Sequence, residues 1–395
     1  MRKGSFFNIF NYLISLFSAA GYLLFSSINT IAADWGLSYS TIGKINFAGY
    51  IFYTLIALFL GSLGDRYGYK KILYPSMFAF SLVTISGLLV YSSHSVLFLY
   101  LFAILVYSYF GLFYPLVEGL LSRAEKLEGI EPSLTTTRFT LSWSSGNMLG
   151  MAFGPYLIQK TPSAVFLIVT AISLFGGTIV LRHYRSFGER LPFNVHKSLL
   201  QKPKAIDFPK INLYRKTYRL SLVLTAMLFS SVISLFPKLM AMSDISLENA
   251  GFLVVAGNVA VFLTFILMGK FRFWVGNPGI SMVLIMLFPL SIPLYFLKTS
   301  VLTFFLVALF TGINYSIPYT FAIFYGLNSP NEDHGKQGGL HETMIGLSFG
   351  FGPLLSGYFL EFWPGLYGMG ILAIILATVS VINQLAFLKR VKKYV

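Results

Sequence analysis

The chain has 395 residues, of which 56% are hydrophobic, 17% aromatic and 11% charged, and its mean hydropathy is +0.72. A soluble globular domain carries about 25% charged residues, so this composition excludes that class and indicates a polytopic membrane protein. The net charge of +15 does not indicate nucleic-acid binding, because the cations lie in short loops between apolar runs and form no recognition motif.

Apolar runs long enough to cross a bilayer recur along the whole chain. Because the bilayer core requires about 20 apolar residues per helix, we expect an all-α polytopic fold with twelve transmembrane helices. The start MRKGSFFNIFNYLISLF has a long apolar run and no small-residue cleavage site, so we interpret it as the first helix rather than a cleaved signal peptide. The predicted spans are 8–33, 42–63, 72–91, 95–121, 134–158, 163–182, 218–240, 249–269, 279–297, 300–326, 340–361 and 365–388.

The stretch GSLGDRYGYKK separates the second predicted helix from the third. Its glycines permit a tight turn and close contact between helices. Its acid can approach the positive N-terminal end of a helix from the other half of the chain, such as the eleventh. Its cations can reach carboxylates or lipid headgroups, and alternatively they only set the topology. The residues concerned are Gly61, Gly64, Asp65, Arg66, Gly68, Lys70 and Lys71.

Charged residues inside predicted spans are few and are candidates for function. Glu118 lies near the end of the fourth helix, and Arg138 lies about one turn into the fifth. The two helices are antiparallel neighbours, so these side chains can form an ion pair at similar depth. Alternatively, Glu118 is a coupling or gating carboxylate. His341 and Glu342 fall in the first turn of the eleventh helix.

Small residues recur four apart in the fifth helix and again in the eleventh. This spacing lets two helix backbones approach closely, and the proline that follows bends the helix. The fifth helix carries Gly146, Gly150, Gly154 and Pro155, and the eleventh carries Gly346, Gly350, Gly352 and Pro353.

The sequence contains no complete catalytic or metal-binding motif in a suitable structural context. Gly346 to Gly350 fits the G-x-S-x-G pattern, but that motif needs a strand-turn-helix elbow and here lies within a predicted membrane helix. His341-Glu342 starts an H-E-x-x-H pattern that ends in Ile345. No phosphate-binding loop of the Walker type occurs, and the absence of cysteine excludes thiolate sites. We therefore expect neither an enzyme nor an ATP-driven pump, with no cofactor and no metal.

The polar stretch 183–217 falls near the midpoint of the chain. We interpret it as a linker between an N-terminal six-helix bundle, 1–182, and a C-terminal one, 218–395. If both termini are cytoplasmic, only four of the 29 Lys and Arg residues fall on the outer side, namely Lys44, Lys160, Lys238 and Lys298. Cytoplasmic loops are enriched in Lys and Arg, so we expect this orientation, in the plasma or inner membrane.

Short matches between the two bundles indicate a repeat. LFSS at 24–27 recurs at 228–231, Gly61 and Gly68 match Gly269 and Gly276, and the Gly-Pro at 154–155 matches that at 352–353. The three matches come in the same order at nearly one offset. We expect two parallel six-helix repeats related by an axis along the membrane normal.

With these features the chain resembles the major facilitator superfamily over essentially its whole length. The turn at 61–71 matches the family signature Gly-x-x-x-Asp-Arg-x-Gly followed by basic residues. The resemblance implies a secondary transporter that works by alternating access, in which this turn helps to control the switch. In the second copy, Phe273 and Trp274 replace Asp65 and Arg66, so we expect the gate to be asymmetric.

Two further features bear on this resemblance. The glycines of the fifth helix resemble a family motif that is commoner in exporters than in importers. Against proton coupling, Tyr107 stands where many members carry an arginine in the fourth helix, and the only acid of the first helix is Asp34, at its outer end.

Uncharged polar and aromatic residues lie at middle depth in the helices that line the cavity of that family. A site built from amides, hydroxyls and rings suits a neutral polar or amphipathic ligand, whereas an anion would require a cation. The alternative is that some of these groups only bond between helices. The candidates are Ser26, Asn29, Tyr50, Tyr53, Tyr107, Trp143, Asn147, Ser230, Asn258, Asn314 and Tyr315.

The leading hypothesis is therefore a secondary active transporter of a small neutral or amphipathic organic solute, with efflux favoured and protons as a candidate co-substrate. One alternative is uptake or facilitated transport of a neutral solute such as a sugar. An alternative of another class is a receptor or scaffold that kept the fold and lost transport. The expected partners are the solute and the lipid bilayer, without nucleic acid, and we expect a monomer.

Overall fold

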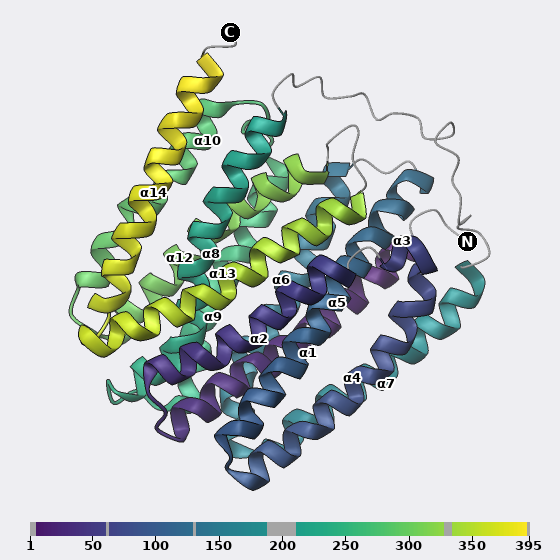
Figure 1. The fold of residues 1–395 in the computed structure, drawn as a ribbon, viewed down its shortest axis with the longest axis horizontal. Coiled ribbons are helices and arrows are strands. Elements are labelled where there is room, and N and C mark those ends of the chain that lie inside the picture. Colours follow the sequence, from purple (N-terminus) through teal and green to yellow (C-terminus); the bar gives the residue numbers. More distant parts are fainter. Residues whose placement is uncertain (1–4, 61–62, 129–131, 188–210, 328–333, 393–395) are drawn as a thin grey trace.

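The computed structural model describes residues 5–60, 63–128, 132–187, 211–327 and 334–392, and every regular element in them is a helix (Figure 1). Before residue 188, the N-terminal half comprises α1 Ser5–Asp34, α2 Tyr39–Leu60, α3 Leu63–Tyr67, α4 Tyr69–Ser93, α5 Val96–Glu128, α6 Pro132–Lys160 and α7 Pro162–Phe187. After residue 210, the C-terminal half comprises α8 Ile211–Ala241, α9 Leu247–Lys270, α10 Pro278–Ile285, α11 Leu287–Leu290, the 3-10 helix η1 Ile292–Phe296, α12 Val301–Leu327, α13 His334–Phe362 and α14 Tyr367–Lys392.

Eleven helical stretches in the described residues are long and apolar enough to cross a membrane. The remaining predicted span is α6, which has 29 residues but carries many serines and threonines. Several of these hydroxyls donate to carbonyls of α6 itself, and the Ser145 hydroxyl also hydrogen-bonds to that of Ser15 in α1 at 2.9 Å. The position of α6 therefore depends on contacts with other helices, and the all-α polytopic architecture is confirmed.

The ninth predicted span is interrupted, whereas a single helix over 279–297 was expected. It consists of α10, α11 and η1 in succession. Pro289 and Pro293 lack the N–H that would continue the helical hydrogen bonds, and their rings crowd the preceding turn. The hydroxyl of Ser291, at the junction of α11 and η1, accepts a hydrogen bond of 2.8 Å from Asn314 Nδ2 in α12.

The turn between the second and third spans contains a short helix, α3. Gly68 follows it with φ of +92°, in the left-handed region that favours glycine. Gly276, its predicted counterpart in the C-terminal half, has φ of +71°. The two matched turns therefore share their unusual backbone conformation at the matched glycine.

A seam of small residues joins α1 to α6, and a second seam joins α8 to α13. A side chain added at Gly154 would clash with Ser26, and one at Gly352 would clash with the Met227 carbonyl and with Ser230. Glycine is required at both places because the helices approach so closely.

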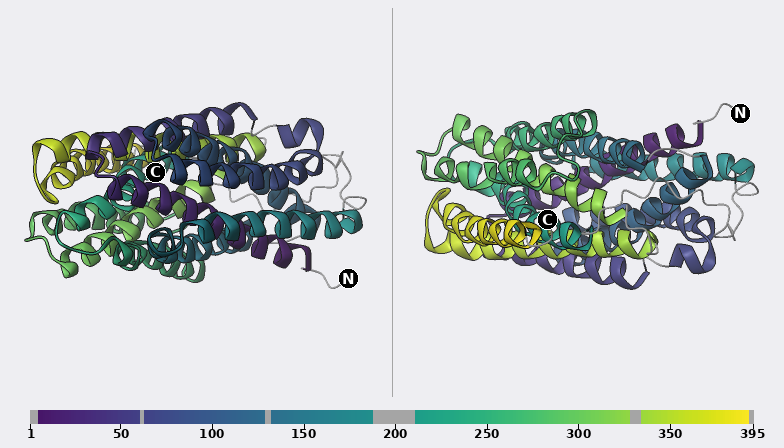
Figure 2. Two further views of the ribbon diagram at one scale, coloured as in Figure 1. Left: turned by 90° about the horizontal axis from the view of Figure 1, so that it is seen from below. Right: turned by 90° about the horizontal axis from the view of Figure 1, so that it is seen from above.

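The helices run side by side and slant across the long axis of the molecule (Figure 1 and Figure 2). In the N-terminal half α4 packs on α7 at the periphery, and in the C-terminal half α14 packs on α8. The halves meet mainly where α2 packs on α13 and where α6 packs on α9 (Figure 1). The space between these two contacts holds the site described next.

Candidate functional site

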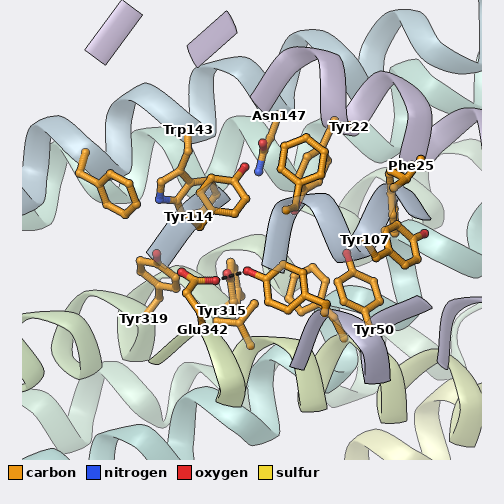
Figure 3. A pocket seen from close by; sticks show the side chains of 17 residues that line it. Tyr22, Phe25, Tyr50, Tyr107, Tyr114, Trp143, Asn147, Tyr315, Tyr319 and Glu342 are labelled. Carbon is orange, nitrogen blue, oxygen red and sulfur yellow. Dashed lines mark hydrogen bonds between the residues drawn. The ribbon is translucent and has the colours of Figure 1, made fainter. Parts of the chain in front are cut away.

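A cavity lies between the two halves (Figure 3). Six helices contribute to it: α1, α2, α5 and α6 from the N-terminal half, and α12 and α13 from the C-terminal half. Its lining is mostly aromatic. The residues are Gly21, Tyr22, Phe25, Tyr50, Tyr53, Val106, Tyr107, Phe110, Tyr114, Phe139, Trp143, Asn147, Tyr315, Tyr319, Glu342, Ile345 and Phe349.

The aromatic rings are held in place by glycines on facing helices. Tyr107 packs directly over Gly49, and Phe110 packs over Gly21, so that any side chain there would clash with the ring. Tyr107 also stacks on Tyr50, with ring centroids 4.3 Å apart. Flat, rigid ring faces that lose little entropy on binding suit a ligand with a planar or apolar ring.

A few polar groups interrupt this aromatic surface. Glu342 extends from α13 into the cavity and accepts a hydrogen bond from the Tyr53 hydroxyl of α2 (Figure 3). Trp143 Nε1 and Asn147 Oδ1 have no hydrogen-bond partner among the described residues, although both are buried. One free donor and one free acceptor on α6 are therefore available to orient a bound solute.

The far end of the cavity, towards Tyr39 and Lys160, is closed by contacts between the halves. The Ser40 amide donates a hydrogen bond of 3.0 Å to Glu361 Oε1. Lys160 forms a salt bridge of 2.7 Å with Glu248. Its hydrogen bond to Glu248, and then the charge of that carboxylate, raise the pKa of Lys160.

The other end, at which α7 ends and α8 begins, is called the linker end and is closed as well. A Cβ added at Gly339 of α13 would lie 3.2 Å from the Ala57 carbonyl oxygen of α2. One added at Gly269 of α9 would lie 2.6 Å from Thr137 of α6. With contacts at both ends, the cavity is occluded.

Of the residues expected at the cavity, the structure brings six together around it. They are Tyr50, Tyr53, Tyr107, Trp143, Asn147 and Tyr315.

The other expected cavity residues, where the structure shows their partners, bond between or within helices. Asn29 accepts a hydrogen bond of 2.8 Å from Asn46, which in turn accepts one from the Tyr107 hydroxyl. The Ser230 hydroxyl donates to the Ser348 carbonyl, and Asn314 donates to Ser291. Asn258 is buried away from the cavity lining and has no side-chain partner among the described residues. Ser26 donates to the Gly150 carbonyl.

Several other aromatic members of the lining were not anticipated. Tyr22, Phe110, Tyr114 and Tyr319 are spread over three helices, and nothing in their local sequence separates them from rings that face lipid. A usable signal was the pairing of ring and glycine on neighbouring helices, as at Phe110 and Gly21.

The buried charges do not pair as expected. Among the described residues no ion pair joins Glu118 to Arg138, and neither Glu118 oxygen has a hydrogen-bond partner. Helix α5 is rotated so that Glu118 meets α13 instead: a Cβ added at Gly338 would lie 2.6 Å from Glu118 Oε2. Glu342, expected near the helix end, lines the cavity.

The residues of the turn at 61–71 are described in part. Gly61 lies outside the described residues, and so do the side chains of Asp65 and Lys70. Arg66 and Lys71 are exposed, and Gly64 lies under the ring of Tyr69. The proposed contact of Asp65 with a helix terminus therefore stays a prediction.

The glycines of α6 and α13 have different partners. Gly146, Gly150 and Gly154 pack against α1 within the N-terminal half. In α13, Gly350 faces Tyr50 and Phe47 of α2 in the other half, whereas Gly352 faces α8. Gly350 and Gly352 of α13 therefore allow close approach to two different helices, α2 and α8.

A family model described as the Major Facilitator Superfamily matches residues 9–327 of the chain. Among solved structures, a bacterial homologue of the human lysosomal transporter Spinster, inward-facing and unoccupied, is similar with TM-score 0.69 at 16% identity, with 96% of each chain covered. The nucleoside transporter NupG is similar with TM-score 0.62 at 14% identity, with 97% of this chain and 98% of that chain covered. No curated protein matches the chain. At these identities the solved structures show a shared fold.

Proposed function

Because this chain belongs to the Major Facilitator Superfamily, we propose that it is a secondary transporter that moves a small organic solute across the membrane by alternating access. The observation that carries this proposal is the occluded cavity between the two halves, which is lined by six helices and closed at both ends. A compartment of this kind is the intermediate that alternating access requires, since opening either end exposes the same residues to a different side.

The lining favours a neutral or amphipathic solute that contains a ring. Stacked aromatic faces such as those of Tyr50 and Tyr107 accept planar or apolar rings, and Trp143 and Asn147 can hydrogen-bond polar groups on the solute. An anion finds no cation in the lining. Nucleosides, the substrates named for NupG, and sugars both belong to this class of solute.

We propose export as the direction of transport, because Gly146, Gly150 and Gly154 resemble a motif that is commoner in exporters. The positive-inside rule favours cytoplasmic termini in the plasma or inner membrane. The two halves then act as six-helix units on either side of the linker, in a monomer. Uptake of a neutral solute such as a sugar is the alternative within this class.

Solute binding and flux test the proposal directly. Purified protein is screened by thermal shift against nucleosides, neutral sugars and uncharged aromatic amphiphiles, and positive compounds are then tested for flux in proteoliposomes. We expect one class to raise the melting temperature and to be transported. Stabilisation of the protein by none of these solutes, together with no flux, contradicts the proposal.

A matched pair of variants ties binding to the cavity. Tyr315→Ala removes a lining ring that stacks on Phe229, and we expect about a tenfold or greater loss of affinity. Leu82→Ala removes an exposed side chain of α4, which is 71% accessible, and we expect unchanged affinity. Equal effects of the two changes would place the binding site elsewhere.

Two-sided accessibility separates a transporter from a receptor that has the same fold. The native chain has no cysteine, so Asn147→Cys introduces a single label site in the cavity. In a transporter this cysteine is labelled from each side of the membrane, with proportions that change when solute is added. Labelling from one side under all conditions supports the receptor or scaffold instead.

A further inference from the structure

Two buried carboxyl groups from different halves lie side by side at the linker end of the cavity. Glu118 comes from α5 and is 6% exposed, and Glu342 comes from α13 and is 4% exposed. Glu118 packs against Gly338, one turn before Glu342 in α13. Glycine at 338 leaves the room that the Glu118 carboxyl occupies, so the approach of these two groups depends on close packing of α5 on α13.

Neither carboxyl is neutralised by a cation in the described part of the chain. Glu342 accepts a hydrogen bond from the Tyr53 hydroxyl, and both Glu118 oxygens lack a partner. Arg219 of α8 is held by Gln337 Oε1 at 2.7 Å. Arg138 of α6 is half-buried and forms no ion pair with Glu118.

The other titratable groups of the helices packed here are one histidine and several tyrosines. His341 is buried against the Tyr319 ring, and neither of its ring nitrogens has a partner among the described residues. It adjoins Glu342 in sequence and is the group that a test must separate from the carboxyls. The tyrosines are Tyr22 of α1, Tyr53 of α2, Tyr114 of α5, and Tyr315 and Tyr319 of α12.

Two adjacent carboxylates out of water and without a cation cannot both stay ionised, because desolvation and mutual repulsion favour keeping a proton on the pair. We propose that Glu118 and Glu342 form a proton site that holds one shared proton while the linker end is closed and releases it when that end opens. The inference rests on the proposed alternating access, since opening separates α5 from α13 and hydrates both groups.

The sign of the pH effect follows from this linkage. A proton bound in the closed state and released in the open state stabilises closure at low pH, and opening becomes easier as the pH rises. Because Glu342 also lines the cavity, the proton site and the solute compartment share one residue. Solute movement and proton release are thereby tied to the same separation of the halves.

Cysteine accessibility at the linker end measures the effect. Thr137→Cys places a thiol where α6 meets Gly269 of α9, and it becomes accessible when this end opens. Ser92→Cys, on an exposed residue at the other end of the bundle, corrects for the change in thiolate fraction with pH. Relative labelling by a maleimide in purified protein is expected to rise several-fold between about pH 5 and about pH 9.

Two sets of variants assign the effect to the carboxyl pair. Glutamine imitates a protonated carboxyl, so Glu118→Gln/Glu342→Gln is expected to give low labelling that no longer depends on pH. His341→Gln is expected to keep the dependence of the parent. A double variant that is as pH-dependent as the parent overturns the proposal, and so does a parent whose labelling does not change with pH.

A measurement on the parent protein covers the case in which the variants do not fold. Infrared spectroscopy detects the C=O band of a protonated carboxyl, and we expect this band to be lost over the pH range in which Thr137→Cys becomes accessible. Its absence at low pH overturns the proposal. If solute flux is found but does not depend on pH, the proton site is contradicted and the transport function is not. If opening depends on pH but no solute is transported, the transport function is contradicted and the proton site is not.

Discussion

The seam between α1 and α6 and the seam between α8 and α13 are built from matching residues. The Ser26 hydroxyl donates to the Gly150 carbonyl at 3.3 Å, and the Ser230 hydroxyl donates to the Ser348 carbonyl at 3.3 Å. The two serines belong to the LFSS matches, and each lies against the glycine of a Gly-Pro pair. The sequence repeat therefore preserves one helix-to-helix contact in each half.

The two turns that match in sequence differ in the burial and contacts of their side chains. Arg66 is exposed, whereas Trp274 at the matching position is 3% exposed and donates a hydrogen bond of 3.1 Å to the Met268 carbonyl. Backbone shape is shared, as the positive φ angles of Gly68 and Gly276 show. The halves thus share helix packing and turn geometry, while the side chains that carry charge or fill space have diverged.

The largest expected loss of stability tests the difference between the two turns. Trp274→Ala removes a ring that packs on Phe321 and Phe324, and we expect it to cost about 3–5 kcal/mol of stability. Arg66→Ala removes an exposed side chain and is expected to cost less than about 0.5 kcal/mol. Denaturant or thermal unfolding of the purified variants measures both, and similar losses would contradict the distinction.

The next effect concerns the two seams. Alanine at Gly352 would meet the Met227 backbone carbonyl, which cannot move without shifting α8, and we expect a loss of about 2–3 kcal/mol. Alanine at Gly154 would meet mainly the Ser26 hydroxyl, which can rotate, and we expect about 1 kcal/mol. Gly279→Ala is the control, since its Cβ would meet only Asn277 Oδ1 at 3.5 Å. Unfolding of the purified variants measures these losses of stability. A larger loss for Gly154→Ala than for Gly352→Ala would contradict this explanation of how the two seams differ.

A smaller effect separates two cavity tyrosines from opposite halves. Tyr107→Phe removes the hydroxyl that donates to Asn46 Oδ1 at 3.0 Å, and we expect a loss of about 1 kcal/mol in stability. Tyr315→Phe is expected to leave stability nearly unchanged, because no hydrogen bond of its hydroxyl is found in the described residues. Thermal unfolding tests both, and an equal loss in Tyr315→Phe would reveal a partner for that hydroxyl.

The smallest effect concerns the salt bridge at the far end. Lys160 and Glu248 are partly exposed, so Lys160→Ala is expected to change the labelling of Asn147→Cys from that side by less than about twofold. Because the pKa of Lys160 is raised, its contribution is present below its ordinary value of 10.5 and is lost as the pH rises through the higher folded value. High salt should remove the difference. Lys298→Ala, on an exposed residue, is the control, and an equal change there would dismiss the salt bridge.

The amino-acid sequence predicts the helices well and the cavity in part, for physical reasons. The length of an apolar run determines whether a segment can span the bilayer, so most spans can be predicted directly from the sequence. The exception is α6, which is too polar to meet this criterion. The interruption of the ninth span was visible in Pro289 and Pro293. A polar residue inside a membrane helix can either face a cavity or hydrogen-bond to a neighbouring segment of the protein. Asn29 and Asn314 hydrogen-bond to neighbouring segments.

Helix rotation explains what the sequence leaves undetermined at the site. An ion pair between Glu118 and Arg138 was one of the two interpretations of Glu118, because the two residues lie at similar depth on consecutive helices. Depth follows from position in the sequence, but the direction of a side chain around its helix depends on packing against all neighbours. Gly338 on α13 provides the space into which Glu118 turns, and that relation links residues 220 positions apart.

The interrupted ninth span bears on how the protein is assembled. A helix broken at α10, α11 and η1 leaves backbone groups without helical partners, and lipid offers them none. Packing against α12 and α14 covers one side of this segment, and both of those helices are synthesised after it. The ninth span therefore cannot reach its final form when it first leaves the ribosome. Its contacts with α12 and α14 are completed only when the last quarter of the chain has been made, at the closing stage of biosynthesis.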